Sequence, residues 1–124
     1  MARPLVILLS SASWEARYQA ATLGATAAAL GDPVTIALAF EALRLWAAGR
    51  FDEGAPPSAA EARIASLRDT IEEARRELSL RVVACDTLVR LAGLEPDAVR
   101  PLVDEVTTLT AIWRRARGGN AIAL

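Results

Sequence analysis

The chain has 124 residues, 53% of them apolar and 23% charged, so it is long enough to bury one core and too apolar to be disordered. Its formal net charge is −1, and all 14 cationic side chains are arginines. A nearly neutral protein has no electrostatic reason to bind nucleic acid or a membrane surface, so neither is expected as a partner. The absence of histidine excludes histidine general bases and histidine metal ligands.

The chain contains one cysteine, Cys85, which has no second cysteine with which to form an internal disulfide. Arg3 and the apolar residues 5–9 are similar to the start of a signal peptide, but this apolar run is too short for one. No apolar stretch reaches the length of a membrane span. We therefore expect a cytoplasmic protein with a single domain over residues 1–124.

Short apolar runs rich in β-branched residues alternate with longer alanine-rich or amphipathic stretches. The predicted strands are residues 4–9, 34–39, 80–85, 102–106 and 121–124. The predicted helices are residues 14–30, 41–48, 86–92 and 110–117, with one helical turn over residues 96–100. Most connections are long enough for parallel crossovers, so the order of elements predicts a parallel sheet with helices on both faces.

Residues 51–57 are the most loop-like segment, and a further helix is predicted directly after them. Ser58 and Glu61 have the spacing of a capping box, in which each side chain binds a free backbone N–H group. Apolar residues then recur at spacings of three and four along one stripe: Ala60, Ile64, Leu67, Ile71, Ala74 and Leu78. The opposite face carries charges four residues apart, which predicts modest ion pairing in solvent: Arg68, Glu72 and Arg76.

Reactive groups and ligands of an open parallel sheet gather beyond the carboxyl ends of the strands. Three pairs of residues directly follow or end predicted strands at this edge: Ser10 and Ser11, Phe40 and Glu41, and Cys85 and Asp86. Trp14 begins the predicted helix that follows the first strand. We expect Ser11, Trp14, Phe40 and Cys85 to surround one shallow pocket or interface at this edge.

Cys85 is the candidate reactive side chain, because it ends a strand and directly precedes a helix. The free N–H groups and the positive dipole end of that helix favour a thiolate. Asp86 acts in the opposite direction, because a carboxylate beside the sulfur disfavours its ionisation. The alternative is a buried cysteine that serves as a small apolar side chain, and the sequence leaves both open.

Ser10, Ser11 and Ser13 precede a helix and have the composition of a phosphate-binding turn. No glycine-rich phosphate loop accompanies them, so ordinary helix capping is the favoured interpretation. The acidic residues near the predicted edge do not form a set of metal ligands, and no metal is expected: Glu15, Glu41 and Asp86.

The three tryptophans are interpreted as core or interface residues: Trp14, Trp46 and Trp113. Three arginines cluster at the end of the last predicted helix: Arg114, Arg115 and Arg117. Cations at this position complement the helix dipole, and docking of an acidic partner is the alternative interpretation.

Residues 80–87 read Leu-Arg-Val-Val-Ala-Cys-Asp-Thr and continue to Leu-Ala-Gly-Leu at residues 91–94. This segment resembles the cysteine region of the DsrE/DsrF-like sulfur-relay family, in which a strand of the type Val-x-Val-x-x-Cys runs into a short helix that ends in an Ala-x-Gly-like turn. Residues 5–10, the alanine-rich helix, residues 34–40 and residues 99–113 correspond in order and spacing. The resemblance covers nearly the whole chain, and its specific motif is the Cys85 segment.

The resemblance implies a three-layer α/β/α sandwich around a five-stranded, mainly parallel sheet, usually assembled as trimers or hexamers. Characterised members carry sulfur as a cysteine persulfide and pass it between proteins. By motif, Cys85 is the catalytic position, and sulfur donor and acceptor proteins are the expected partners. Thiol–persulfide exchange needs no metal or organic cofactor, so none is expected.

Two other functions remain open at this level. The first is a non-catalytic subunit of an oligomeric assembly, since the family also contains scaffold subunits without a working cysteine. The second is a small-ligand or nucleotide binder at the strand edge. A self-contained two-cysteine peroxidase cycle is excluded, because one cysteine leaves no resolving thiol. Small residues in the helix over residues 14–30 permit close helix packing, which together with the resemblance predicts a homotrimer or homohexamer.

Overall fold

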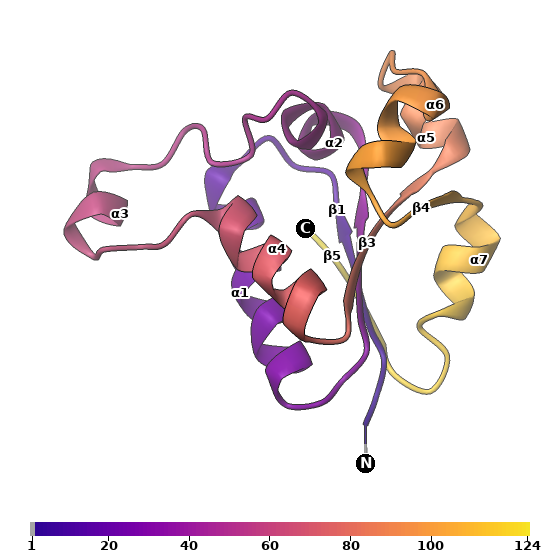
Figure 1. Ribbon diagram of the computed structural model, residues 1–124, viewed down its shortest axis with the longest axis horizontal. Coiled ribbons are helices and arrows are strands. Elements are labelled where there is room, and N and C mark those ends of the chain that lie inside the picture. Colours follow the sequence, from indigo (N-terminus) through magenta and orange to yellow (C-terminus); the bar gives the residue numbers. More distant parts are fainter. Residues whose placement is uncertain (1) are drawn as a thin grey trace.

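The computed structural model describes residues 2–124, in which five parallel strands form one sheet of order β4-β3-β2-β1-β5 (Figure 1). The strands are β1 (Leu5–Leu9), β2 (Val34–Leu38), β3 (Leu80–Cys85), β4 (Glu105–Thr107) and β5 (Asn120–Ala123). The helices are α1 (Trp14–Ala29), α2 (Phe40–Ala47), α3 (Pro57–Glu61), α4 (Leu67–Glu77), α5 (Asp86–Leu91), α6 (Pro96–Val99) and α7 (Leu109–Arg114), and a 3-10 turn, η1, covers Arg100–Leu102.

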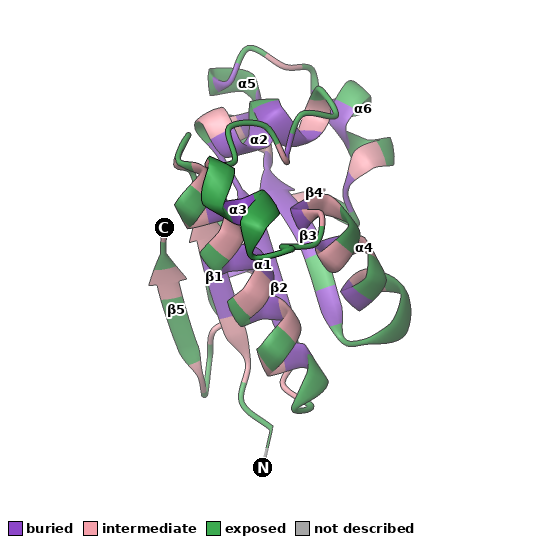
Figure 2. Cartoon of the chain, turned by 90° about the vertical axis from the view of Figure 1, so that its left-hand side faces the viewer, coloured by how far each residue is buried: buried purple, intermediate pink, exposed green. Residues whose placement is uncertain are grey.

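Helices cover both faces of the sheet, so the predicted three-layer α/β/α fold class is confirmed. Figure 1 shows α1 and α4 on one side of the strands and α7 on the other. In Figure 2 the strands run upward, and α2 and α5 lie above their carboxyl ends. The continuous apolar run of β2 is buried along its whole length, as expected for a central parallel strand.

The larger part of the core lies between the sheet and the helices α1 and α4. Ile7 on β1, Ile36 on β2 and Val82 on β3 are paired neighbours in the register, and all three are fully buried in this cluster. Gly24 lets α1 approach closely, because a Cβ atom there would lie 3.3 Å from the Leu80 side chain. The alternation of side chains along each strand sends the intervening residues to the opposite face.

That opposite face has a smaller core beneath α7. It contains Val6, Ala37, Val83 and Cys85 from the three central strands, with Ile112 from α7 packed against them. Since α7 has 6 residues and α1 has 16, the two faces of the sheet receive unequal cover. β5 lies at the edge of the sheet and is exposed along most of its length (Figure 2).

Arg17 ties the predicted loop after α2 to the beginning of α1. Its side chain is 2% exposed and donates hydrogen bonds to the backbone oxygens of Phe51, Ala12 (3.2 Å) and Glu53 (2.8 Å). The guanidinium also lies 5.8 Å from the centre of the Phe51 ring. Desolvation by burial lowers the pKa of Arg17, and nearby carboxylates oppose this effect. These bonds fix a segment that has no regular secondary structure of its own.

The single helix predicted after residue 57 is wrong, because two helices, α3 and α4, occupy this segment. Arg63 between them adopts a left-handed conformation with φ of 56°, which breaks the helical path. Ser66 then caps α4 by accepting a hydrogen bond from the Asp69 N–H (3.1 Å). The carboxylate of Asp52 also accepts from the N–H groups of Leu67 and Arg68. A carboxylate from a distant loop therefore sets the start of α4, which local periodicity does not reveal.

The predicted capping box is also absent. The N-cap residue of α3 is Pro56, and no side chain caps that helix. Of the predicted apolar stripe, the buried members on α4 are Leu67, Ile71 and Ala74, whereas Ile64 and Leu78 are exposed. On the polar face Glu72 pairs with Arg68 (3.7 Å) and Arg75 (2.6 Å), while Arg76 pairs with Glu77 (3.7 Å).

The fourth strand begins later than residues 102–106 suggest. Arg100–Leu102 forms the 3-10 turn, and the pairing with β3 begins where Glu105 faces Val83. Asp104 marks the start of this pairing, because its backbone N–H donates to the Val82 oxygen (2.7 Å) and its carboxylate accepts from the Val82 N–H (2.7 Å). A polar residue that interrupts the apolar pattern thus anchors the strand rather than ending it.

Candidate functional site

Cys85 is the last residue of β3 and the N-cap residue of α5. Its backbone is extended, with φ of −82° and ψ of 131°, and the strand alternation places its side chain on the α7 face. The residue is 6% exposed and packs with the smaller core that contains Ile112. Cys85 is therefore a free cysteine near the surface of the molecule but largely shielded from solvent.

A cavity of about 180 Å³ lies beside Cys85 at the carboxyl ends of the three central strands. Its wall includes Leu8 and Ser10 from the end of β1, and the segment from Ala37 to Phe40 that leads from β2 into α2. Leu88 on α5 and two residues of α7 complete it: Leu109 and Ile112. The wall is apolar apart from Ser10 and Cys85, and it contains no charged residue.

Phe40 lies on this wall in an uncommon backbone conformation. Its φ is 48°, in the left-handed region that a residue with a large side chain rarely adopts. The neighbouring backbone is held by the Ala39 N–H bond to the Leu9 oxygen (2.9 Å) and the longer Ala42 N–H bond to the Ser10 oxygen (3.4 Å). Such a conformation costs on the order of 1–3 kcal/mol and persists only where the surrounding structure enforces it. Here it leaves the Phe40 side chain 43% exposed at the cavity.

The structure brings three of the predicted site residues together at one cavity: Ser10, Phe40 and Cys85. The Ser10 N–H donates to the Leu124 oxygen (2.9 Å), and its hydroxyl lies 3.5 Å from the same oxygen. The carboxyl ends of parallel strands meet at one edge of the sheet, and these residues, at the ends of β1, β2 and β3, therefore lie at the same edge.

The other predicted residues do not line this cavity. Ser11 accepts a hydrogen bond from the Ser13 N–H (3.0 Å) within the turn before α1. Trp14 stacks on Tyr18 at 5.3 Å between ring centres and lines a separate hollow beside Asp52. The two acidic residues form ion pairs within their own helices: Glu41 with Arg44 (3.0 Å) and Asp86 with Arg90 (2.8 Å).

The ion pair of Asp86 bears on the charge beside Cys85. The hydrogen bond from Arg90 to Asp86 raises the pKa of Arg90 above its ordinary value. The carboxylate adjacent to Cys85 is therefore balanced by a cation one helical turn away.

The sequence analysis did not name seven of the residues that line the cavity: Leu8, Ala37, Leu38, Ala39, Leu88, Leu109 and Ile112. Leu88 follows Cys85 at a spacing of three, which places it on the same side of α5. Leu109 follows β4, so the same strand-end rule would have included it had the bounds of β4 been placed correctly. The predicted strand ended at residue 106, whereas β4 ends at Thr107, two residues before Leu109.

No family model matches the sequence, and no curated protein matches it either. Among solved structures, the crystal structure of the YchN protein from E. coli aligns over 100% of both chains, with a TM-score of 0.66 and 14% sequence identity. YchN has a DsrE/DsrF-like fold. The present chain shares the fold of YchN. At 14% identity the likeness concerns the arrangement of the backbone alone.

Two further observations concern the described residues. Over residues 2–124, no group of three or more histidine, cysteine, aspartate or glutamate side chains is placed to hold a metal ion. None of the helices in the described part of the chain is both long and apolar enough to span a bilayer.

Proposed function

We propose that this chain is a DsrE-like sulfur carrier, or sulfurtransferase, in which Cys85 receives persulfide sulfur from one protein and passes it to another. The observation that carries the proposal is the position of Cys85 on the wall of a cavity at the carboxyl edge of the sheet. The likeness of the fold to YchN and the resemblance of the Cys85 segment to the sulfur-relay motif support it.

The proposed transfer begins when the Cys85 thiolate attacks the outer sulfur of a donor persulfide. A bond forms between the Cys85 sulfur and that outer sulfur, while the sulfur–sulfur bond of the donor breaks. The electron pair of the broken bond leaves with the donor, which becomes a thiolate. The outer sulfur keeps its proton when it is transferred to Cys85. An acceptor thiolate then repeats the step on the Cys85 persulfide. Sulfur is exchanged without net oxidation or reduction.

The wall of the cavity suits a polarisable sulfur group. Sulfur packs well among apolar side chains, and an extra sulfur atom on Cys85 needs little room. Phe40 and Leu109 are the exposed large side chains on the wall, so their rotamer changes give access to Cys85. Rotamer changes of exposed side chains take picoseconds to nanoseconds, which is fast compared with transfer between proteins.

The test is the mass of the intact protein after incubation with a persulfide donor. We expect a gain of one sulfur atom, about 32 Da, that a reductant removes. Cys85→Ser should abolish the gain and keep the circular dichroism spectrum of the folded protein. A native protein that stays unmodified while the unfolded protein reacts would contradict the proposal.

A non-catalytic subunit is the second candidate, because Cys85 is 6% exposed and packs with Val83 and Ile112. In that case the native cysteine resists alkylation, and the buried serine hydroxyl of Cys85→Ser lowers the free energy of unfolding by about 1–3 kcal/mol. Comparing the alkylation rates of native and urea-unfolded protein separates the two functions. A native rate close to the unfolded rate favours the sulfur carrier.

A further inference from the structure

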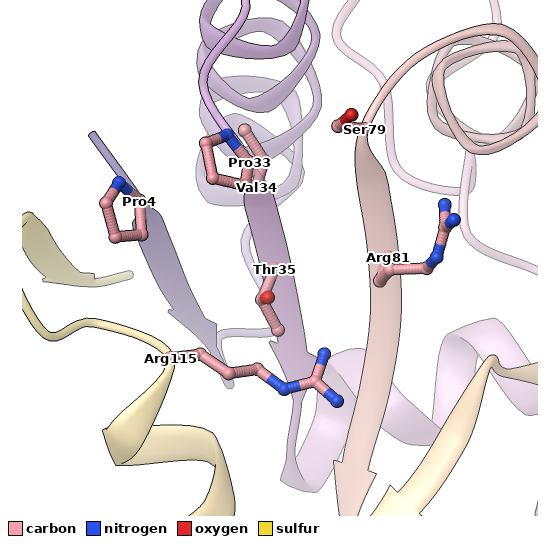
Figure 3. Close-up of a pocket in the computed structure, with 7 residues that line it drawn as sticks. All are labelled: Pro4, Pro33, Val34, Thr35, Ser79, Arg81 and Arg115. Carbon is pink, nitrogen blue, oxygen red and sulfur yellow. The ribbon is translucent and has the colours of Figure 1, made fainter. Parts of the chain in front are cut away.

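A second hollow lies on the α7 face of the sheet, at the opposite ends of the strands from Cys85. Its volume is about 340 Å³, and it is lined by Pro4, Pro33, Thr35, Ser79, Arg81 and Arg115 (Figure 3). In Figure 3 Pro4, Pro33 and Ser79 mark the beginnings of β1, β2 and β3, and Arg115 reaches across from the end of α7. The short α7 leaves this part of the face uncovered.

Arg81 is the main cation of this hollow. It is the exposed residue of the otherwise buried strand β3, and its guanidinium donates to the backbone oxygen of Leu80 (2.9 Å). Within residues 2–124 no carboxylate lies in ion-pair distance of it. The nearby carboxylate of Asp104 is already bound by both Nε and Nη2 of Arg75, each at 3.0 Å. Arg81 therefore has charge and donors available for a ligand.

Arg115 provides the second cation. In Figure 3 its guanidinium lies beside β2, beyond Thr35, and it forms an ion pair with Glu105. Both side chains of this pair are substantially exposed, and such pairs contribute roughly 0–1 kcal/mol. An incoming anion can thus displace Glu105 from Arg115 at a cost of about this size.

Two hydroxyl groups complete the polar part of the wall. Thr35 is 7% exposed and is one of the two buried polar or charged residues of the described chain, the other being Arg17. Thr35 on β2 faces the hollow, and Ser79 lies at the start of β3. The side chains of Arg81, Arg115, Thr35 and Ser79 line one hollow and together offer hydrogen-bond donors suited to an anion with several oxygen atoms. In Figure 3 the Arg81 guanidinium is turned away from Thr35 and Arg115, so a rotamer change of this exposed side chain brings it to the anion.

We propose that this hollow binds an oxyanion of the phosphate or sulfate type, either free or as the head group of a small ester. Arg81 and Arg115 donate charged hydrogen bonds to it, Thr35 and Ser79 donate neutral ones, and Pro4 and Pro33 contact the rest of an ester. Arg81 precedes Cys85 by four residues on the same strand, a separation of about 13 Å. The site is therefore distinct from the Cys85 cavity and does not depend on sulfur transfer.

The experiment is an NMR titration of the whole protein with sodium phosphate and with sodium sulfate, against sodium chloride of equal ionic strength. We expect saturable shifts of the amides at residues 34–35 and 79–81 with either oxyanion and not with chloride. Arg81→Gln and Arg115→Gln should each weaken binding by about tenfold or more, because each removes a charge-assisted hydrogen bond. Cys85→Ser should bind as the wild type does.

Arg114→Gln is the matched control, since it removes the same charge from α7 at a residue that does not line the hollow. Equal weakening by Arg114→Gln, or shifts spread over the whole surface, would overturn the site. Absence of saturable shifts in the wild type would also overturn it. Phenyl phosphate distinguishes the sources: tighter binding than phosphate indicates an ester, and equal or weaker binding indicates the free ion.

Discussion

At the scale of single residues, Phe40 is placed to limit access to the cavity beside Cys85. Its left-handed backbone directs the chain from β2 into α2 and leaves its ring on the cavity wall near Cys85. A glycine would adopt this conformation without strain, yet the position holds a large aromatic side chain. The ring therefore covers the cavity at the expense of local backbone strain.

Replacing this ring should change the reactivity of Cys85. We expect Phe40→Ala to raise the alkylation rate of native Cys85 several-fold, because the variant removes a wall that shields the sulfur. Leu91→Ala is the control, since Leu91 is exposed on α5 but does not line the cavity. Alkylation followed by intact mass measures both. Equal rates in Phe40→Ala and the wild type would show that Phe40 does not limit access.

Arg17 is the residue with the largest expected effect on stability. Arg17→Met keeps the apolar stem but leaves the backbone oxygens of Ala12, Phe51 and Glu53 without their donors. We expect the free energy of unfolding to fall by about 3 kcal/mol in urea denaturation. Arg117→Met, at an exposed residue after α7, should change it by less than about 0.5 kcal/mol. Similar losses of stability in the two variants would contradict a stabilising role for the hydrogen bonds of Arg17.

At the scale of elements, Asp104 joins α4, β3 and β4. Its carboxylate accepts two hydrogen bonds from Arg75 (both 3.0 Å) and one from the Val82 N–H (2.7 Å). Burial alone raises the pKa of Asp104, but these hydrogen bonds outweigh burial and lower the pKa below its ordinary value of 3.8. The folded protein therefore holds the proton of Asp104 less tightly than the unfolded chain does.

The lowered pKa of Asp104 makes its contribution to the free energy of unfolding depend on pH. A carboxyl whose folded pKa is depressed adds stability above its unfolded pKa and loses it as the pH falls through the folded value. We expect Asp104→Asn to be less stable than the wild type at pH 7, with the difference shrinking from about pH 5 downwards. Urea denaturation from pH 7 to pH 3 measures this, and Asp97→Asn controls for net charge. A difference that stays constant with pH would contradict the role of the ionised carboxylate.

The elements also show how far the sequence alone leads. The strand before Cys85 was predicted correctly, because its residues other than Arg81 are apolar, as expected of a parallel strand that is buried on both faces. The helix after residue 57 was not, because Asp52 and Ser66 start α4 through hydrogen bonds that apolar spacing does not encode. At the site, strand ends brought Ser10 and Cys85 together, whereas the orientation of Trp14 depends on its contact with Tyr18.

At the scale of the whole molecule, the alanines of α1 serve mainly the core of the chain itself. Ala20, Ala21 and Ala28 are buried against the sheet, so they provide less support for helix contacts between copies than the sequence suggests. Several large apolar side chains remain exposed instead, among them Leu109 and Trp113 on α7. Burial of these side chains between copies is the remaining structural reason to propose assembly.

We expect the protein to form a homotrimer or homohexamer at micromolar concentration. Light scattering should give about three or six times the chain mass of 13.2 kDa. Trp113→Glu should shift this mass toward the monomer, because it places a charge at an exposed aromatic residue of α7, while Glu61→Gln on α3 should leave it unchanged. A monomeric mass for the wild type would refute the assembly.

The strand order has a consequence for the time course of folding. Leu5 on β1 pairs with Val34 on one side and with Asn120 on the other, so the second pairing closes a far longer loop. Longer loops cost more entropy to close, so β5 should join the sheet after β2 has done so. Ile112, which packs against Cys85, lies eight residues before Asn120, the first residue of β5, and should dock together with that late segment. A refolding chain should therefore pass through an intermediate in which the Cys85 thiol is exposed to solvent. A pulse of thiol reagent at that stage would label Cys85 before α7 packs against it.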